Sequence, residues 1–488
     1  MSSQDQIDIF PDAKRGLSRS ILSGAAWNLF NLFFSKGVSY IALLILARIL
    51  VPDDFGLVAI ALIFTGLFTV IGDLGLTGAI IQRREEQLDR VHLDTAFWAS
   101  AAFNLVLLVL FAGLIGPLVS WFYDREILHA IVAVSALQMS ISTFSVVPKA
   151  ILTRNLAFRT LVIAESSAAI VAAIAAITFA LNGYGAWSLV FQTLIQAIVL
   201  CLLLWLNLRW FPQFRFSKEA LRDLLGFGIY DALVRIVIYF SKNVDYLMVG
   251  KFLGPQALGA YSIAFLMTDL LRSQIMAVLN RVMFPIYGRL QDHPTEIRRH
   301  YLLVVRYNTL AVTPVMILFF FMAEEIIQIF LGNEWSEAIV PLKAMAVASV
   351  IHSIGGTTGA VFRGMGKTSL HFYIYTFKTL FVTIPLYATG ILLFGLIGAA
   401  LSMVFSKIIA RFIGQWYLKR LISVSEKDII SSLKPAFYSS LSSLPAVTFI
   451  LFFPFKPTAL VFTAIALSIF VPYSVTAFIV NKRCQIIY

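Results

Sequence analysis

The sequence contains few charged residues and almost no cysteine. Of its 488 residues, 13% are charged and 59% are hydrophobic, whereas about 25% of the residues of an ordinary soluble domain are charged. This shortage of charge excludes a chain that folds wholly in water. The two cysteines, Cys201 and Cys484, lie far apart in the chain. They indicate neither a disulfide framework nor a metal site of the CxxC type.

The sequence also lacks an N-terminal secretory signal and large polar domains. Residues 1–20 mix acidic and basic side chains and contain no short apolar core followed by a cleavage site, so we expect a cytoplasmic tail there. The longest loop predicted on the outer side, residues 324–337, is too short to fold independently or to form a conventional active site. Function is therefore expected within the apolar segments.

Long apolar runs fill most of the chain. A helix of about 20 apolar residues crosses the ~30 Å hydrocarbon core, and such runs predict an all-α membrane protein of about fourteen transmembrane helices. The predicted spans are 25–49, 56–81, 95–121, 127–147, 160–181, 186–208, 224–250, 258–285, 304–323, 338–362, 370–394, 396–418, 435–453 and 458–480. The predicted domains are a cytoplasmic tail (1–24), an N-lobe of six helices (25–208), a cytoplasmic linker (209–223), a C-lobe of six helices (224–418), a cytoplasmic linker (419–434), two further helices (435–480) and a cytoplasmic tail (481–488).

The net charge of +12 is explained mostly by membrane topology. An even number of spans places both termini on one side, and loops rich in Lys and Arg face the cytoplasm. With the N-terminus inside, the inner segments hold 24 basic residues and the outer loops hold 4. Both termini are therefore predicted to be cytoplasmic, and binding to nucleic acid is not needed to explain the charge.

An internal repeat supports a design of two lobes. Residues 47–68 align with residues 250–271 at a constant offset of 203, and the alignment pairs Pro52 with Pro255 in corresponding loops. Repeats that surround a central substrate site are common in transporters. Because each repeat has an even number of helices, both lobes share one orientation, which predicts a pseudo-two-fold axis along the membrane normal.

Ten basic residues fall within the predicted spans, against five acidic ones. Each charge in hydrocarbon costs about 2.5–3.5 kcal/mol on insertion scales, so charges in mid-span usually face a polar interior. Arg281, Arg306 and Lys343 lie near span ends and are expected to extend to the interface. The basic residues that lie deeper within the spans are predicted to line a cationic cavity. They are Lys36, Arg235, Lys242, Arg272, Lys378 and Lys407.

Pairing between neighbouring charges is the competing explanation for these residues. In the seventh span, Asp231, Arg235, Lys242 and Asp245 share one helical stripe. This spacing allows two ion pairs within the span, Asp231 with Arg235 and Lys242 with Asp245. The sequence leaves open whether these residues pair with each other or bind a ligand.

The same alternative applies to Asp269 and Arg272, which are three residues apart in the eighth span. By contrast, Lys36, Lys378 and Lys407 have no acidic residue within their own spans. They are the strongest candidates for binding an anionic ligand, although a partner on another helix would change this interpretation.

Buried acidic residues and one histidine are candidates for ion coupling or for pairing. Burial raises the pKa of a carboxylate whereas neighbouring Lys or Arg lowers it, and the sequence does not show which effect dominates. A histidine in mid-span titrates near neutrality, but it is more often a hydrogen-bonded packing residue. The candidates are Asp73, Glu165, Asp231, Asp245, Asp269 and His352.

Residues 364–368 end like a nucleotide-binding loop. The first glycine of that motif is replaced by Val361, and no strand precedes it. Nucleotide binding is therefore not expected. The sequence also indicates no catalytic residue, cofactor or metal. Transport would be driven by an ion gradient, with protons or sodium as the candidate ions, or by supply and removal of the substrate.

Several short motifs follow predicted spans or lie within them. They are Ala47-Arg48-Ile49-Leu50-Val51-Pro52-Asp53-Asp54-Phe55-Gly56, Gly72-Asp73-Leu74-Gly75-Leu76, Pro148-Lys149-Ala150-Ile151-Leu152-Thr153-Arg154 with Phe158-Arg159, and Phe362-Arg363-Gly364-Met365-Gly366-Lys367-Thr368. With these motifs the chain resembles one family of membrane carriers, the polysaccharide transporter or Wzx-type flippases of the multidrug/oligosaccharidyl-lipid/polysaccharide exporter superfamily. The resemblance covers nearly the whole chain.

This resemblance implies a MATE-like fold in the bacterial inner membrane. It also implies transport of undecaprenyl-diphosphate-linked repeat units to the periplasmic face, for capsule, exopolysaccharide or O-antigen assembly, by alternating access around a cationic central cavity. The expected partners are the lipid-linked anionic oligosaccharide, the bilayer and polysaccharide polymerase machinery, without nucleic acid. The chain is expected to act as a monomer.

Two other functions remain open at this point. A MATE-like antiporter for cationic drugs or metabolites should favour carboxylates in its spans, whereas basic residues dominate here. An integral-membrane glycosyltransferase or polymerase should carry acidic catalytic motifs at a membrane face or a sizeable outer loop, and the sequence predicts neither. A structural scaffold would not need charges in the middle of several spans.

Overall fold

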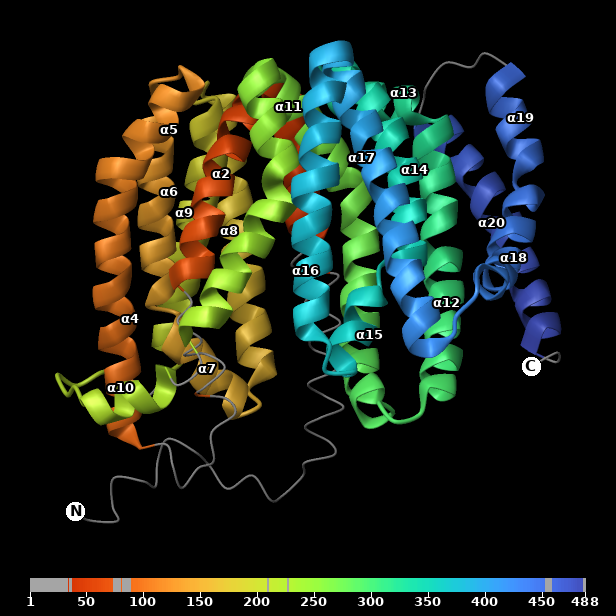
Figure 1. Cartoon of the computed structure of the whole chain (residues 1–488). Coiled ribbons are helices and arrows are strands. Elements are labelled where there is room, and N and C mark those ends of the chain that lie inside the picture. Colours follow the sequence, from red (N-terminus) through yellow and green to blue (C-terminus); the bar gives the residue numbers. More distant parts are fainter. Residues whose placement is uncertain are drawn as a thin grey trace. The chain divides into compact units, whose positions relative to one another are not determined.

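The computed structural model describes residues 34, 37–72, 80, 89–208, 210–225, 228–452 and 459–485. Helices joined by short turns make up these ranges, and none of the residues in them forms a strand (Figure 1). The predicted all-α class is therefore confirmed. The chain divides into two compact units, Met1–Phe240 and Ser241–Tyr488, and the long helix α11 (Gly228–Arg289) contributes residues to both.

The first apolar helix among the described residues of the first unit is Gly37–Ile49. Its further elements are α2 (Pro52–Gly72), α4 (Arg90–Leu110), the π-helix η2 (Phe111–Ile115), α5 (Gly116–Tyr123), α6 (Ile127–Thr143), α7 (Val146–Arg154), α8 (Phe158–Leu181), α9 (Ala186–Leu206) and α10 (Lys218–Leu225). Helix α6 packs against α2, α4, α5 and α9, and α8 packs along α9. Helix α6 is therefore the centre of this unit.

Helix α8 shows how the sequence permits this close packing. Its buried face is a stripe of small residues, which let two helix backbones approach closely in a membrane. The buried alanines are Ala164, Ala168, Ala169, Ala172, Ala173, Ala176 and Ala180. The larger Ile174, on another face, is 62% exposed and so lies outside this contact.

The second unit contains the rest of the chain. Its elements after α11 are α12 (Pro294–Phe321), α13 (Ala323–Ile326), the π-helix η3 (Ile327–Leu331), the 3-10 helix η4 (Asn333–Ala338), α14 (Ile339–Gly355), α15 (Thr358–Gly364), α16 (Thr368–Lys378), the π-helix η5 (Thr379–Thr383), α17 (Ile384–Ile422), α18 (Glu426–Ser442), α19 (Leu444–Phe452) and α20 (Ala459–Gln485). Helix α17 packs on α14, α14 on α12, α12 on α18, and α18 on α20 (Figure 1). Each helix in this row covers the apolar face of the next.

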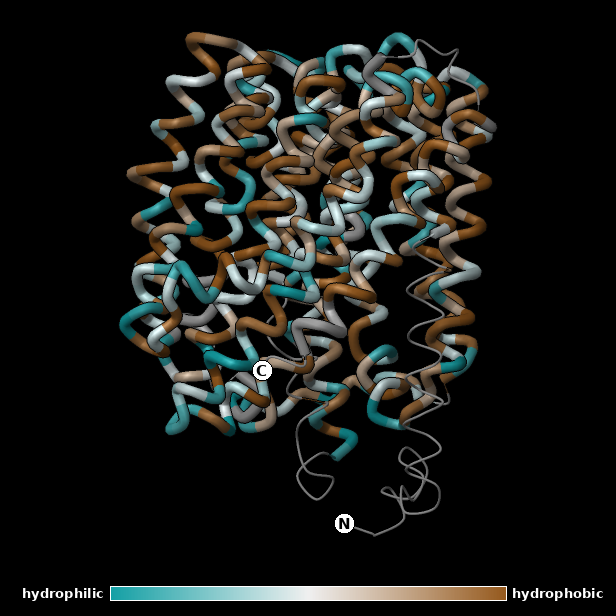
Figure 2. Tube along the Cα trace, turned by 90° about the vertical axis from the view of Figure 1, so that its right-hand side faces the viewer, coloured by the Kyte–Doolittle hydropathy of each residue, from teal (hydrophilic) through white to brown (hydrophobic). Residues whose placement is uncertain are grey.

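Nine helical stretches in the described ranges are long and apolar enough to cross a bilayer, and a bent pair within α11 would add a tenth. Hydrophobic residues extend along their length in Figure 2. A helix satisfies its own backbone hydrogen bonds, which hydrocarbon requires. The chain is therefore a multi-pass membrane protein, as predicted. The total of fourteen spans, their orientation and the domain boundaries stay predictions.

One stretch, Ser369–Ile422, contains 54 residues, far more than a helix rising 1.5 Å per residue needs to cross ~30 Å. Its backbone leaves the helical conformation at Gly395, where φ is 57° and ψ is −134°. The sequence predicts a boundary between two spans at the same residue. Helix α11 breaks in the same way at Gly254, with φ 83° and ψ 176°.

The turns of the two units repeat in backbone detail. After α7, the N–H of Leu156 donates to the carbonyl oxygen of Thr153 over 3.1 Å, and after α15 the N–H of Gly366 donates to that of Arg363 over 3.1 Å. Both turn residues have positive φ, 54° and 72°. They are 210 residues apart, so the second unit repeats a turn of the first.

A second pair of turns has the same offset of 210 residues. Gly185, before α9, has φ 52° and ψ −132°, almost the values of Gly395. This conformation is accessible mainly to glycine. The repeat predicted from residues 47–68 and 250–271 therefore extends to turns whose sequences match poorly.

Gly398 and Gly390 bring the two halves of α17 together on either side of its break. A Cβ atom at Gly398 would overlap the carbonyl oxygen of Gly390. The hydroxyl of Ser402 donates to the carbonyl oxygens of Leu386 and Gly398, both over 2.7 Å. The close approach thus closes a helical hairpin.

We predict that Gly398→Ala destabilises the protein, because overpacking of this kind typically costs about 1–3 kcal/mol. The measurement is the thermal unfolding midpoint of the detergent-solubilised chain. Gly113→Ala is the matched control, since no atom lies within 4 Å of a Cβ placed there. Equal midpoints for the two variants would contradict the packing of this hairpin.

Candidate substrate-binding site

A cluster of charged side chains lies within the second unit, on α11, α14, α16 and α17. Its members, called here the cationic cluster, are Lys242, Asp245, Asp269, Arg272, His352, Lys378 and Lys407. The charges of all four basic members act on His352, and both carboxylates act on Lys407. Four basic side chains face two acidic ones, so the cluster is net positive when His352 is neutral.

Asp245 is the most buried member, with 8% of its surface exposed. The hydroxyl of Tyr261 donates to its carboxylate over 3.3 Å. The ammonium of Lys407 lies near enough for its charge to act on Asp245, and Asp245 in turn acts on Lys378. A buried carboxylate needs such compensation, and here it comes from α16, from α17 and from the part of α11 beyond its break at Gly254.

Sequence reasoning missed the tyrosines that surround this carboxylate. The hydroxyls of Tyr261 and Tyr387 are 3.0 Å apart and buried, and the ring of Tyr246 meets that of Tyr261 edge to face at 5.7 Å. A buried tyrosine hydroxyl needs a hydrogen-bond partner. A tyrosine in the middle of a span therefore indicates a buried polar contact. The partner of Tyr261, which is 126 residues away in the chain, could not be predicted from the sequence.

Lys378 stands at a change in helix geometry. It ends α16 and directly precedes the π-helix Thr379–Thr383, and π-helical turns are frequent at functional sites. Its ammonium lies 4.7 Å from the centre of the Tyr375 ring, a cation–π contact. This contact compensates the charge only in part, so Lys378 stays suited to bind an anion.

Pairing accounts for part of the cluster. Asp269 and Arg272 form the ion pair that their spacing allows, so Arg272 is the basic member most fully neutralised by a neighbour. Lys242, whose spacing from Asp245 allows an ion pair, is exposed. Lys407 is half-buried, and the carboxylates whose charges act on it lie on another helix, α11.

The remaining predicted residues lie apart from this cluster or outside the description. Glu165 accepts from the ammonium of Lys149 over 2.5 Å, which joins α8 to α7 in the first unit. Lys36 and Asp73 lie outside the described residues. Asp231 and Arg235 lie on α11, but the structure does not describe their side chains. The functional roles of all the predicted residues stay predictions.

Two basic residues of the spans take other positions. Arg306 is only 6% exposed, so the expectation that it extends to the interface is wrong; it faces the packed interior of α12. Arg411 forms a two-pronged ion pair with Glu426, with N–O distances of 3.0 and 2.5 Å. The guanidinium of Arg411 therefore joins α17 to α18.

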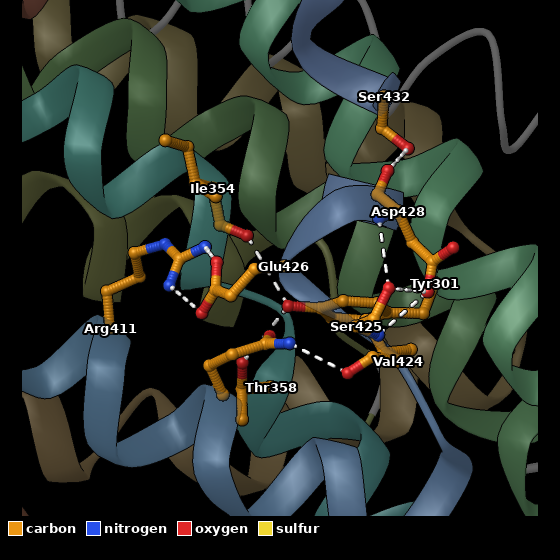
Figure 3. Close-up of polar contacts among 10 residues, drawn as sticks. Tyr301, Ile354, Thr358, Arg411, Val424, Ser425, Glu426, Asp428 and Ser432 are labelled. Carbon is orange, nitrogen blue, oxygen red and sulfur yellow. Dashed lines mark hydrogen bonds and ion pairs between the residues drawn. The ribbon is translucent and has the colours of Figure 1, made fainter. Parts of the chain in front are cut away.

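The ion pair of Arg411 belongs to a polar network at the junction of α17 and α18 (Figure 3). The hydroxyl and backbone N–H of Ser425 donate to the carboxylate of Asp428 over 2.8 and 2.7 Å, and the backbone N–H of Asp428 donates to the Ser425 hydroxyl over 3.3 Å. This capping box fixes the first turn of α18. Arg298 of α12 also pairs with Asp428 over 2.8 Å.

Partial burial disfavours the charged form of Asp428, but hydrogen bonds from Ser425 and the ion pair with Arg298 outweigh it. Together they hold the pKa of Asp428 below its ordinary value of 3.8. A carboxylate whose pKa is lowered by folding stabilises the folded state at any pH above its ordinary pKa. This stabilisation is lost as the pH falls through the lowered pKa.

Asp428→Asn should therefore lower stability at pH 7 by about 1 kcal/mol, a typical value for a helix cap. The difference from the unchanged protein should persist down to about pH 4 and shrink in stronger acid. Thermal unfolding midpoints across this pH range measure it, with Asp292→Asn, an exposed site, as control. A difference that does not change with pH would refute the assigned pKa.

Comparison with known proteins gives the family. The pattern of a family described as "Polysaccharide biosynthesis protein" matches residues 45–340, which is more than half of the chain. The chain belongs to this family. Lipopolysaccharide biosynthesis protein WzxC of Escherichia coli K12 is 24% identical over 443 residues, covering 88% of this chain and 87% of that protein. Succinoglycan biosynthesis transport protein ExoT of Rhizobium meliloti is 25% identical over 358 residues, covering 73% and 72%.

Two solved structures have folds similar to that of this chain. The lipid II flippase MurJ in an inward closed conformation matches with a TM-score of 0.73 at 16% identity, covering 95% of this chain and 100% of that chain. An inward-facing multidrug resistance MATE family transporter of the MOP superfamily matches with a TM-score of 0.63 at 18% identity, covering 81% and 99%. The predicted MATE-like fold is confirmed.

Among the described residues, no group of three or more His, Cys, Asp or Glu side chains could hold a metal ion. The cationic cluster instead presents ammonium and guanidinium groups. Such groups bind phosphates and carboxylates through charge-assisted hydrogen bonds. The arrangement is thus suited to hold an anion within a membrane protein.

Proposed function

We propose that this protein flips a polyprenyl-diphosphate-linked oligosaccharide across the bacterial inner membrane, from the cytoplasmic to the periplasmic leaflet. The observation that carries the proposal is the cationic cluster on several membrane helices of one unit. Membership in the polysaccharide biosynthesis family supports it, as does similarity to ExoT, whose name describes a transport protein. The fold shared with MurJ, a lipid flippase, is consistent with it.

The diphosphate is the part of such a substrate that the cluster fits best. It carries two or more negative charges, and Lys378 and Lys407 provide ammonium groups that the neighbouring carboxylates do not fully neutralise. A charge that enters hydrocarbon must be compensated along its path. Fixed cations on the helices would therefore lower the barrier that a diphosphate meets in crossing the membrane.

Asp245 gives this site a means of release. While the site is empty, its carboxylate compensates Lys407; when a diphosphate binds, the phosphate oxygens take over that role. Because Asp245 competes for the same cation, it would weaken binding and favour departure of the substrate. Proton or sodium coupling, both termini in the cytoplasm, action as a monomer and contact with a polymerase belong to the same proposal.

A drug antiporter shares the fold, but its cationic substrates would be repelled by this cluster. A glycosyltransferase or polymerase would need catalytic acids at a membrane face. The acidic residues of the cluster lie instead beside basic ones, as the ion pair of Asp269 with Arg272 illustrates. The anion carrier is therefore the function that these side chains support best.

Lys378→Ala and Lys407→Ala should each lower the rate of flipping at least about tenfold, since each removes a cation from the path, equivalent to about 1.4 kcal/mol in the barrier. Purified protein in liposomes, with a defined diphosphate-linked oligosaccharide and a membrane-impermeant glycan probe, measures the rate. Lys434→Ala, which alters an exposed lysine of α18, is the control. Unchanged rates in both cluster variants would rule out this site.

Asp245→Asn should have a different effect. Removing the competing carboxylate should tighten binding of the diphosphate-linked substrate about tenfold, or 1.4 kcal/mol, and slow its release. Equilibrium binding and flipping rates measured on the same preparation separate the two effects. Weaker binding in this variant would show that Asp245 does not compete with the substrate.

A further inference from the structure

A groove lined by apolar and aromatic side chains lies between α16 and the last part of α17. Its volume is about 620 Å³, within the range of typical ligand sites. The side chains that line it, called here the aromatic groove, are Tyr373, Ile374, Phe377, Phe412, Ile413, Trp416 and Tyr417. Both walls belong to the second unit.

The groove exists because its two walls diverge. Helix α17 packs firmly on α14 and on the π-helix Thr379–Thr383, but much less on α16. Large aromatic side chains therefore remain uncovered, with Tyr373 exposed by 68%, Phe377 by 58% and Phe412 by 59%. Because α16 and α17 belong to a stretch that is long and apolar enough to span the bilayer, these side chains lie where the hydrocarbon chains of lipids can reach them.

The opposite face of α17 is fixed, which holds the groove wall in position. Arg411 pairs with Glu426 (Figure 3). The side-chain amide of Gln415 donates to the carbonyl oxygen of Val424 over 2.8 Å. Leu418 is fully buried. One face of the helix is therefore held by contacts with the rest of the unit, and the aromatic side chains of the other face line the groove. Because the helix is held in this way, the groove wall is formed before any ligand binds.

One end of the groove is basic. The guanidinium of Arg420 lies 3.6 Å from the ring centre of Trp416, and Lys419 beside it is exposed. On the other wall, the exposed Lys367 directly precedes α16. A guanidinium stacked on an aromatic ring keeps its planar set of N–H donors for a phosphate. The site thus joins an apolar channel to a cationic end.

We infer that the aromatic groove binds the prenyl chain of a polyprenyl-diphosphate lipid, with the diphosphate at Arg420 and Lys419. This inference rests on the proposed function for the identity of the lipid. Charge complementarity decides the orientation: phosphate meets the basic end, and the chain extends along Trp416 and Phe412 into the hydrocarbon. At the far end of the groove, Phe377 directly precedes Lys378 in α16, so one helix carries both a wall of the groove and a member of the cationic cluster.

The experiment uses the full chain in nanodiscs of phosphatidylethanolamine and phosphatidylglycerol. The probe is undecaprenyl diphosphate that carries a diazirine near the end of its prenyl chain, and mass spectrometry locates the cross-links after illumination. We expect labels on α16 and on the 412–417 segment of α17. Unlabelled undecaprenyl diphosphate should displace the probe at a concentration at least about tenfold lower than added phosphatidylglycerol.

Variants test each part of the site. Trp416→Ala should reduce labelling about tenfold, and Ile413→Trp, which fills the groove, should reduce it as well. Arg420→Gln should weaken competition by undecaprenyl diphosphate but not by neutral undecaprenol. Phe437→Ala is the matched control, because this phenylalanine of α18 is 62% exposed and lies outside the groove. Unchanged thermal midpoints confirm that the variants fold.

Three results would overturn the inference. The first is displacement of the probe by phosphatidylglycerol at the same concentration as by undecaprenyl diphosphate, which marks an ordinary lipid contact. The others are cross-links elsewhere on the chain and full labelling of the Trp416→Ala and Ile413→Trp variants. Flipping by the unchanged protein is measured in parallel. Flipping without groove labelling refutes only the groove, whereas absence of flipping with intact labelling refutes only the proposed function.

Discussion

The free energy of placing a charge in hydrocarbon is the constraint on which the arrangement of the second unit depends. Each uncompensated charge costs several kcal/mol there, so a span that keeps one must hold it near an opposite charge, an aromatic face or a polar interior. All three solutions occur in this unit. Asp269 pairs with Arg272, Lys378 meets the ring of Tyr375, and Asp245 is held by Tyr261. The surplus of positive charge that remains is what an anionic substrate can use.

Helix α17 links these local solutions to one another. It carries Lys407 in the cationic cluster, Arg411 in the network with α18, and Trp416 in the aromatic groove. Its break at Gly395 folds the helix back on itself, and its ion pair with Glu426 fixes its other end. A side chain in the cluster and one in the groove are therefore positioned by the same rigid element, which ties a charged site to an apolar one.

Features that depend on local spacing could be predicted from the sequence, at least as alternatives. A separation of three residues allows Asp269 to pair with Arg272, which is one of the two alternatives that the sequence leaves open, and two apolar runs too long for one span predict the break at Gly395. Features that depend on contacts between distant helices could not be read in this way. Glu165 meets Lys149 across a turn, Tyr261 meets Tyr387 from a distant part of the chain, and the burial of Arg306 runs against its position near a span end. In each case, three-dimensional packing decides the partner.

If this protein recognises its substrate through negative charge in the membrane, its affinity must depend on the diphosphate. Equilibrium binding to the full-length protein in nanodiscs measures this dependence with two lipids that have the same glycan and prenyl chain, one joined by a diphosphate and the other by a neutral linkage. We expect saturable binding of the diphosphate lipid, at least about a hundredfold tighter than that of the neutral lipid, equivalent to about 2.7 kcal/mol. Equal affinity for the two lipids would show that negative charge is not what the protein recognises.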